Sequence, residues 1–234
     1  MIVGNDVPLQ AVLFDAGNTL LFLDHPRMAA AVGAALDLPL TGPALAAGAA
    51  VATRAMETPR ADDRARATAY LETLFLQAGV PADRLPEVRA CLAALHGERH
   101  LWSGTAGDTH DALERLRAAG LRLGVVSNSD GRVAEALEAA GLRHYFDVVV
   151  DSTLAGVEKP DPAIFRAALD ALEVPPAAAL YVGDLYEVDV VGARAAGMPA
   201  VLLVPPGLPR PDGCATVGSL EELADDLLKE RLAS

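Results

Sequence analysis

Cysteine is scarce in this sequence, since Cys91 and Cys214 are the only two in 234 residues. Two thiols without paired spacing supply neither a disulfide framework nor a zinc site, so we expect both to be buried or incidental. Long apolar runs are missing as well, because no uninterrupted run reaches the roughly 18 to 20 residues of a membrane-spanning helix. The opening MIVGNDVPLQ lacks the charged segment and apolar core of a signal peptide. These absences predict a cytoplasmic protein without a membrane partner.

Positive charge is also in short supply. The sequence has 19 Lys and Arg against 32 Asp and Glu, which gives a formal net charge of −13 at pH 7. An acidic surface repels nucleic acid and anionic membranes, so neither is a predicted partner. Lysine is much scarcer than arginine, because Lys159 and Lys229 are the only two lysines among the 19 basic residues. A lysine kept at position 159 suggests that a compact point charge is needed there.

Two common signatures of enzyme chemistry are absent from the sequence. Without a GxxxxGKS or GxxxxGKT loop, a nucleoside-triphosphate enzyme of that type has no support. Without a GxSxG turn, a serine hydrolase is disfavoured. Any catalytic chemistry must therefore come from other residues.

From about Gly104 onward, strand-like apolar runs alternate with helical segments. The predicted strands are LRLGVVSNS, YFDVVVDS, AALYVGD and, as the last one, PAVLLVP; the predicted helices are DGRVAEALEAAG, KPDPAIFRAALDAL, EVDVVGARAAG and LEELADDLLKERL. Asp161 is the expected N-cap of its helix, with Pro162 at the first position. This alternation is typical of an α/β fold with a doubly wound, largely parallel sheet.

Residues 22–101 show a different pattern. The segments RMAAAVGAAL, PALAAGAAVATRAM, RARATAYLETLFLQAG and LPEVRACLAALHGE all read as helices, and turn signals such as DLPLTGP separate them. We therefore predict an all-helical insert at 22–101 within an α/β core made of residues 1–21 and 102–234.

Polar side chains stand at the ends of the predicted strands, where ligands bind in parallel α/β sheets. The first strand delivers Asp15 and Thr19, the second delivers Ser127 and Asn128, and Lys159 stands in the turn before the next helix. The fourth delivers Asp184, followed by Glu187 and Asp189. Four separate segments thus bring carboxylates, a hydroxyl group and a lysine to one rim of the sheet.

These residue types fit a phosphate site with a metal and a carboxylate nucleophile. Clustered carboxylates repel one another unless a cation lies between them, and hard oxygen ligands suit Mg²⁺. Ser127 and the following amides are predicted to lie at a helix N-terminus, which attracts phosphate. Lys159 can neutralise an anion beside a nucleophilic carboxylate. Any one of these residues alone could be an ordinary cap or turn residue, and Ser127 could be an N-cap.

In its order of motifs the sequence resembles the haloacid dehalogenase-like hydrolases. The motifs are FDAGNTL, VVSNS, GVEKPDPAIF and YVGDLYEVDVVGARAAGM, and the resemblance covers about Leu9 to Val204. It implies a Rossmann-like core with a helical cap inserted after the first motif, as in the phosphatase-like branch. By this resemblance Asp15 is the nucleophile that forms an aspartyl-phosphate on a small phosphorylated substrate.

The resemblance also implies roles for the other motif residues. Thr19 and Ser127 would bind the phosphoryl group, Asn128 beside them is a further substrate-binding candidate, and Lys159 would steady the same group. Asp184, Asp15 and the carbonyl of Gly17 would bind Mg²⁺, and Asp189 would support that metal site.

Gly17 departs from the family pattern, because phosphatases of this family usually carry a second Asp there that transfers protons. A general acid–base group contributes about 10²–10⁴-fold to the rate. Three explanations stay open: a substrate with a good leaving group, a substitute such as Asp24 or His25, or a catalytically weak phosphate-binding protein of the same fold.

A metal-independent 2-haloacid dehalogenase is a further alternative, since that branch also lacks the second Asp, although it does not keep the GDxxxxD pattern present here. The phosphonatase branch needs a cap lysine, and residues 22–101 contain none. Arginines at 54, 60, 64 and 66 could contact a second anionic group of the substrate, although most are expected to face solvent. The sequence names neither the substrate nor the oligomeric state.

Overall fold

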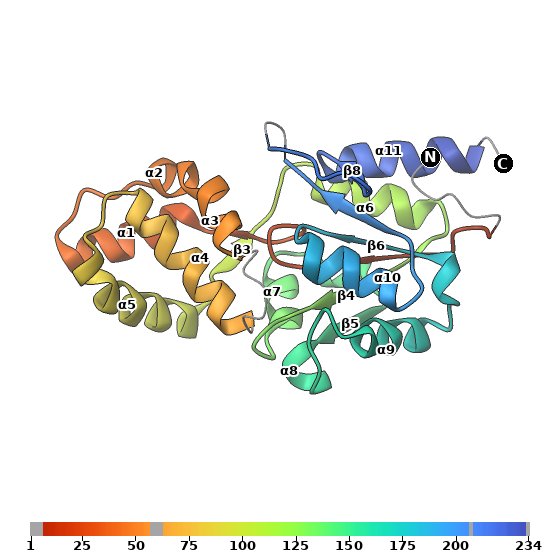
Figure 1. Ribbon diagram of the computed structural model, residues 1–234, viewed down its shortest axis with the longest axis horizontal. Helices are drawn as coiled ribbons and strands as arrows, with labels where there is room; N and C mark the ends of the chain where they lie inside the picture. The colour runs from red at the N-terminus through yellow and green to blue at the C-terminus, as the bar shows by residue number, and fades with distance from the viewer. Residues whose placement is uncertain (1–6, 57–62, 206–207, 233–234) are drawn as a thin grey trace. The chain divides into compact units, whose positions relative to one another are not determined.

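The computed structural model describes residues 7–56, 63–205 and 208–232 (Figure 1). The chain divides into two compact units, one formed by residues 1–22 and 105–234 and the other by residues 23–104. Among the described residues, no helix combines the length and the apolar character needed to cross a bilayer.

A parallel sheet is the centre of the first unit. Within the described residues its strands are, in spatial order, β5 (Val148–Asp151), β4 (Arg122–Ser127), β1 (Ala11–Phe14), β6 (Ala179–Gly183), β7 (Ala200–Leu203) and β8 (Ala215–Val217). Strand β1 pairs in parallel with β4 on one side and with β6 on the other. All the strands therefore end at the same edge, and the fold is the predicted Rossmann-like α/β arrangement.

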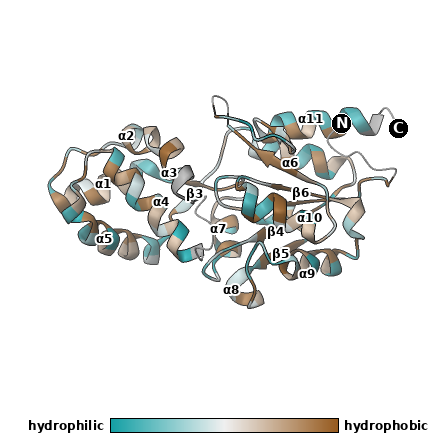
Figure 2. Ribbon diagram, in the orientation of Figure 1, coloured by the Kyte–Doolittle hydropathy of each residue, from teal (hydrophilic) through white to brown (hydrophobic). Residues whose placement is uncertain are grey.

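Both faces of this sheet are buried at its centre. Alternate residues of a strand point to opposite faces, and all four residues of β1 have no exposed surface. Figure 2 shows hydrophobic colour along the strands of the sheet and hydrophilic residues along α11 (Leu220–Leu232). Strands that are covered on both faces read as continuous apolar runs, which is why the sequence signal was strong.

Helices flank the sheet. Those on the first unit are α6 (Thr109–Ala118), α7 (Val133–Ala139), α8 (Ser152–Ala155), α9 (Pro162–Leu172), α10 (Val191–Ala195) and α11. Helices α9 and α10 share a core cluster with Ala11 and Leu13 of β1, while α6 and α11 lie side by side (Figure 1). As predicted, Asp161 caps α9, because its carboxylate accepts a hydrogen bond from the Ala163 amide at 2.9 Å.

The second unit is helical. Its helices are α1 (His25–Leu36), α2 (Gly42–Ala47), α3 (Ala49–Met56), α4 (Asp63–Gln77) and α5 (Leu85–Glu98). They enclose a separate apolar core that includes Met28, Leu45, Leu74 and Phe75. The short strands β2 (Phe22–Leu23) and β3 (Trp102–Gly104) pair where the chain passes between the units. The boundaries at 22 and 101, and the role of a cap, stay predictions.

Three details of the predicted elements were wrong. The strand β7 is not the last one, because β8 follows it and extends the edge of the sheet. The segment predicted as one helix around Gly48 is two helices, since α2 ends at Ala47 with Gly48 as its C-cap, and α3 begins at Ala49. The helix predicted from Glu187 begins instead as a π-helical turn, Tyr186–Val190, and continues as α10.

Candidate active site

The carboxyl edge of the sheet brings together the residues that the sequence singled out. Asp15 directly follows β1, and its amide donates to the Val182 carbonyl of β6 at 2.8 Å. Ser127 is the last residue of β4, and Asp184 follows β6. One carboxylate oxygen from each of Asp15, Asp184 and Asp189 lies within 4.8 Å of the others. The three acidic residues therefore form one cluster at the centre of this edge.

Lys159 is the cation of the cluster, and its side chain is only 2% exposed. Its Nζ donates to Asp15 Oδ1 at 2.5 Å, to Asp189 Oδ1 at 2.8 Å and to the Tyr181 hydroxyl at 3.1 Å. An ammonium group has three donors, so these three acceptors use all of them. Burial lowers the pKa of Lys159, but the charges of Asp15 and Asp189 outweigh it and hold the pKa well above the usual value.

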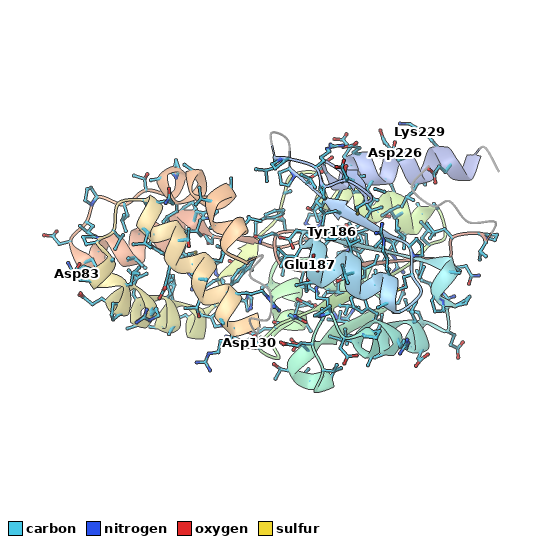
Figure 3. The ribbon with its side chains drawn as sticks, in the orientation of Figure 1. Asp83, Asp130, Tyr186, Glu187, Asp226 and Lys229 are labelled. Carbon is cyan, nitrogen blue, oxygen red and sulfur yellow. The ribbon has the colours of Figure 1, made fainter. Side chains whose placement is uncertain are left out.

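The other lysine has a different environment, which supports the special status of position 159. Figure 3 shows Lys229 beside Asp226 on α11, and the side chain of Lys229 is 70% exposed at 3.8 Å from that carboxylate. A surface pair of this kind contributes little to stability. Of the described lysines, only Lys159 lies in a buried cluster of charged residues.

Asp189 is placed by the π-helical turn that precedes α10. Its second oxygen accepts a hydrogen bond from the Leu185 amide at 2.9 Å. A Cβ at Gly183 would lie 2.3 Å from the Asp189 carboxyl carbon, so only glycine leaves room for this side chain. The glycine before Asp184 is thus a packing requirement, and Asp189 serves to hold Lys159.

Of the three carboxylates in the cluster, Asp184 has the fewest described polar contacts that would offset its negative charge. Its described polar contact is with Asn18, whose Nδ2 donates to Asp184 Oδ2 at 3.3 Å. Burial, followed by the charges of Asp15 and Asp189, raises the pKa of Asp184 well above its usual value. Asn18 itself has a φ of 54°, a left-handed conformation that asparagine tolerates better than most residues.

The pKa of Asp15 is raised as well. Burial raises the pKa of Asp15 to about 7, with Lys159 acting to lower it and Asp189 to raise it further. Three buried or partly buried carboxylates thus share one lysine, and a divalent cation would favour their ionised forms. The donor set consists of hard carboxylate oxygens, which is the chemistry that Mg²⁺ prefers. The residues present therefore fit a bound Mg²⁺ at Asp15 and Asp184.

Thr19 lies in the loop after β1 and is 1% exposed. Its hydroxyl oxygen has no hydrogen-bond partner among the described residues. A buried hydroxyl without a partner is costly, so this atom is a natural contact for a ligand oxygen. Gly17 lies in the same loop and forms an isolated bridge with Leu21; the use of its carbonyl by a metal stays a prediction.

Asn128 has a structural task that the sequence did not indicate. Its Oδ1 accepts from the Lys159 amide at 2.8 Å, and its Nδ2 donates to the Lys159 carbonyl at 3.1 Å. Asn128 therefore fixes the backbone that carries the lysine. Its role as a substrate ligand stays a prediction, as does that of Ser127, which is 4% exposed at the end of β4.

The predicted helix N-terminus beside Ser127 was wrong. Helix α7 begins at Val133, six positions later, and Ser127 belongs to the strand rather than capping a helix. The carboxylate of Asp151 accepts hydrogen bonds from the amides of Gly131 at 3.0 Å and Val133 at 3.3 Å. The Asp151 carboxylate thus occupies two amides of the segment that follows Ser127.

Two residues around the site were missed by the sequence analysis. Asp151 is 3% exposed at the end of β5, and its position after VVV was a strand-end signal like that of Asp15. Tyr181 has no exposed surface in the middle of β6, where a phenol among apolar residues was the available clue. Burial raises the pKa of Tyr181 well above its usual value, so its hydroxyl stays neutral.

Three other candidates, Glu187, Asp24 and His25, have the following environments, and the role of Asp24 or His25 as a substitute acid stays a prediction. Glu187, labelled with Tyr186 in Figure 3, is exposed on the π-helical turn and does not join the cluster. Asp24 caps α1 through the Arg27 amide at 3.0 Å and pairs with Arg99 at 2.8 Å. His25 is half-buried, and burial lowers its pKa while Asp24 acts in the opposite sense.

The four arginines named as candidate substrate contacts, at positions 54, 60, 64 and 66, differ in exposure where the structure describes them. Arg64 is exposed and Arg66 is buried. Arg60 and the side chain of Arg54 lie outside the described residues. No general role in substrate binding follows from this distribution, so the role of these arginines stays a prediction.

The fold and the cluster together define an α/β enzyme that works at the carboxyl edge of a parallel sheet. Comparison with protein families agrees, because the model of the haloacid dehalogenase-like hydrolases matches residues 9–197. The chain belongs to this hydrolase family.

Known relatives match parts of the chain. The Bos taurus haloacid dehalogenase-like hydrolase domain-containing protein 3 is 48% identical over 94 residues, which is 40% of this chain and 38% of that protein. A glyceraldehyde 3-phosphate phosphatase from Methanopyrus kandleri is 38% identical over 124 residues, 52% of this chain and 53% of that protein. The matched region spans about half or less of these relatives' own length.

Solved structures match nearly the whole chain. A HAD phosphatase from Thermococcus onnurineus has a TM-score of 0.60 and 26% identity, with 94% of this chain and 98% of that chain covered. A 2-haloacid dehalogenase from Pseudomonas syringae has a TM-score of 0.58 and the same 26% identity, with 95% and 99% covered. Overall similarity therefore does not distinguish a phosphatase from a dehalogenase. The distinction depends on the residues of the site.

Proposed function

We propose that this chain is a Mg²⁺-dependent phosphatase that attacks a small phosphorylated compound through the carboxylate of Asp15. The observation that carries the proposal is the cluster in which Lys159 joins Asp15 and Asp189, while Asp184 makes no ion pair within the described part of the chain. A nucleophilic carboxylate needs a charge beside it that neutralises the phosphoryl oxygens, and Lys159 has this position. The phosphatase-named relative supports the same reaction.

The proposed reaction has two steps. An oxygen of Asp15 attacks phosphorus, the bond between phosphorus and the leaving oxygen breaks, and an aspartyl-phosphate forms on Asp15. Water then attacks the same phosphorus, which releases inorganic phosphate and restores the carboxylate. Lys159 keeps Asp15 oriented for the first step, and the hydroxyl groups of Thr19 and Ser127 bind phosphoryl oxygens.

Mg²⁺ would be held by Asp15 and Asp184, with the carbonyl of Gly17 as a further ligand. When bound, the ion supplies positive charge that offsets the charge of the phosphoryl group and of the carboxylates. Asp189 contributes indirectly, since its described contacts are to Lys159, Tyr181 and the Leu185 amide.

Gly17 bears on the kind of substrate. Proton transfer to a leaving alkoxide requires an acid, and the loop Ala16–Gly17–Asn18 offers no acidic side chain. Asp24 is bound to Arg99, and burial lowers the pKa of His25, which disfavours its protonated, acidic form. We therefore propose a substrate whose leaving group departs without protonation, such as an acyl or aryl phosphate. The unit at 23–104 is the proposed substrate-selecting cap.

Hydrolysis of p-nitrophenyl phosphate tests the proposal. We expect turnover with Mg²⁺, loss of turnover with EDTA, and a fall of at least about 10³-fold in Asp15→Asn. Asp161→Asn makes the same chemical change at an exposed helix cap and should retain activity. Acid-quenched wild-type protein should carry the mass of one phosphoryl group on Asp15. Persistent turnover in Asp15→Asn would exclude this nucleophile.

A 2-haloacid dehalogenase is the second candidate, because a solved dehalogenase is as similar to this chain as the solved phosphatase. In that reaction Asp15 would displace halide from carbon, and water would then cleave the ester. Neither step needs Asp184 beside the nucleophile. Halide release from 2-chloropropionate in the presence of EDTA, lost in Asp15→Asn, would favour this candidate over the phosphatase.

A further inference from the structure

Tyr181 lies beneath the catalytic edge, and its hydroxyl joins three separate elements. The oxygen accepts a hydrogen bond from Lys159 Nζ at 3.1 Å and donates one to the Val126 carbonyl at 2.9 Å. It also lies 3.3 Å from Asp189 Oδ1. Tyr181 belongs to β6 and Val126 to β4, and β1 lies between these two strands. The hydroxyl therefore links the two neighbours of the strand that carries Asp15.

The ring of Tyr181 is held as firmly as its hydroxyl. Its centroid lies 4.9 Å from that of Phe165 on α9 in an edge-to-face arrangement, and the side chain has no exposed surface. Edge-to-face aromatic pairs are favourable and directional. The oxygen is thus a fixed acceptor whose position the sheet and α9 determine together.

The three acceptors of Lys159 have unequal roles in the proposed reaction. Asp15 must change its contacts when it bonds to phosphorus, so its hydrogen bond cannot fix the ammonium throughout. Asp189 and Tyr181 do not react, and together they can hold Nζ in place while Asp15 changes. Two fixed acceptors restrict a flexible four-carbon side chain far more than one does.

We propose that Tyr181 is a positioning residue that, together with Asp189, holds the Lys159 ammonium in place for transfer of the phosphoryl group to Asp15. This inference rests on the proposed function. It predicts that the Tyr181 hydroxyl contributes to the chemical step rather than to substrate binding, because its bond is to Lys159 and not to the substrate.

Kinetics of Tyr181→Phe test the inference, since this change removes the hydroxyl and keeps the ring. With p-nitrophenyl phosphate and Mg²⁺, we expect kcat to fall about tenfold while KM changes less than about twofold. Tyr145→Phe is the matched control, because Tyr145 is also buried and its hydroxyl contacts only His110, at 3.4 Å, among the interactions described for it. That variant should keep the wild-type kcat.

A second measurement separates positioning from general damage and does not need turnover. Urea unfolding of Tyr181→Phe, Lys159→Met and the double variant forms a double-mutant cycle. If the hydroxyl acts through the lysine, the double variant is less destabilised than the sum of the single variants. Additive effects, or an unchanged kcat in Tyr181→Phe beside an active wild type, would overturn the inference.

Failure of the proposed function can be distinguished from failure of the inference about Tyr181. A wild type without turnover dependent on Asp15 would refute the phosphatase, whereas the unfolding cycle would still report whether Tyr181 and Lys159 are coupled. A fall in kcat that Tyr145→Phe reproduces would assign the effect to loss of any buried hydroxyl and would also overturn the inference.

Discussion

At the scale of the residue, Gly17 is the position where a single side chain should change the reaction. The φ of Gly17 lies outside the left-handed region, so Gly17→Asp introduces a proton donor without backbone strain. We expect hydrolysis of an alkyl phosphate to rise about tenfold or more and that of an aryl phosphate to change little, because only the alkoxide needs a proton. Gly17→Asn is the control, since it has the same shape without an acid. An equal rise in both variants would contradict this account.

The gathering of single residues at the site was predictable where the motif order identified them, and was not predictable where a contact distant in sequence decides it. Asp15, Lys159, Asp184 and Asp189 were selected from strand ends, and the structure places them in one cluster. Tyr181 was not selected, because only the parallel order β4-β1-β6 brings its hydroxyl across to Lys159. A local sequence pattern contains no information on a contact that depends on the order of the strands.

At the scale of the element, Asp151 should determine the shape of the segment that follows β4. Its carboxylate accepts from the amides of Gly131, Val133 and Thr153 at 3.0 to 3.3 Å. Asp151→Asn removes the charge and one acceptor oxygen, so we expect a loss of about 2 kcal/mol of unfolding free energy in urea. We also expect a higher KM, because Ser127 precedes this segment.

Asp147→Asn is the control. Asp147 lies at the opposite end of β5, where its carboxylate accepts a hydrogen bond from the Leu123 amide at 3.0 Å. This variant should have lower stability and an unchanged KM. An unchanged KM in Asp151→Asn would exclude the link to Ser127.

Elements with strong periodicity were predictable, and those that depend on neighbours were not. The buried strands and α9 were found because apolar runs and the Asp161–Pro162 cap are local signals. The strand β8 has only three residues, and its pairing with β7 rather than its composition makes it a strand. The π-helical turn forms where Asp189 reaches back to the Leu185 amide and to Lys159. The pairing of β8 with β7 and the contact of Asp189 with Lys159 join segments that are distant in sequence, and local patterns do not reveal such contacts.

At the scale of the whole molecule, stability should depend jointly on Mg²⁺ and pH. Burial raises the pKa of Asp15 from 3.8 to about 7, and the pKa of Asp184 is raised well above its usual value. A carboxyl whose pKa is higher in the folded state binds more protons there, so its contribution to stability is lost as pH rises from about 4 through 7. Without metal, these two residues should therefore make the protein less stable at pH 8 than at pH 5.

Magnesium should reverse that trend, because it competes with protons for the same oxygens and binds better once they are ionised. At a concentration about one hundred times its Kd at pH 8, Mg²⁺ should raise the unfolding midpoint by roughly 5–10 °C. The same concentration at pH 5 should have a much smaller effect. Thermal unfolding followed by circular dichroism at both pH values measures this, with Asp184→Asn as the control that should not respond. An equal rise at both pH values, or a full response in Asp184→Asn, would place the metal away from Asp15 and Asp184.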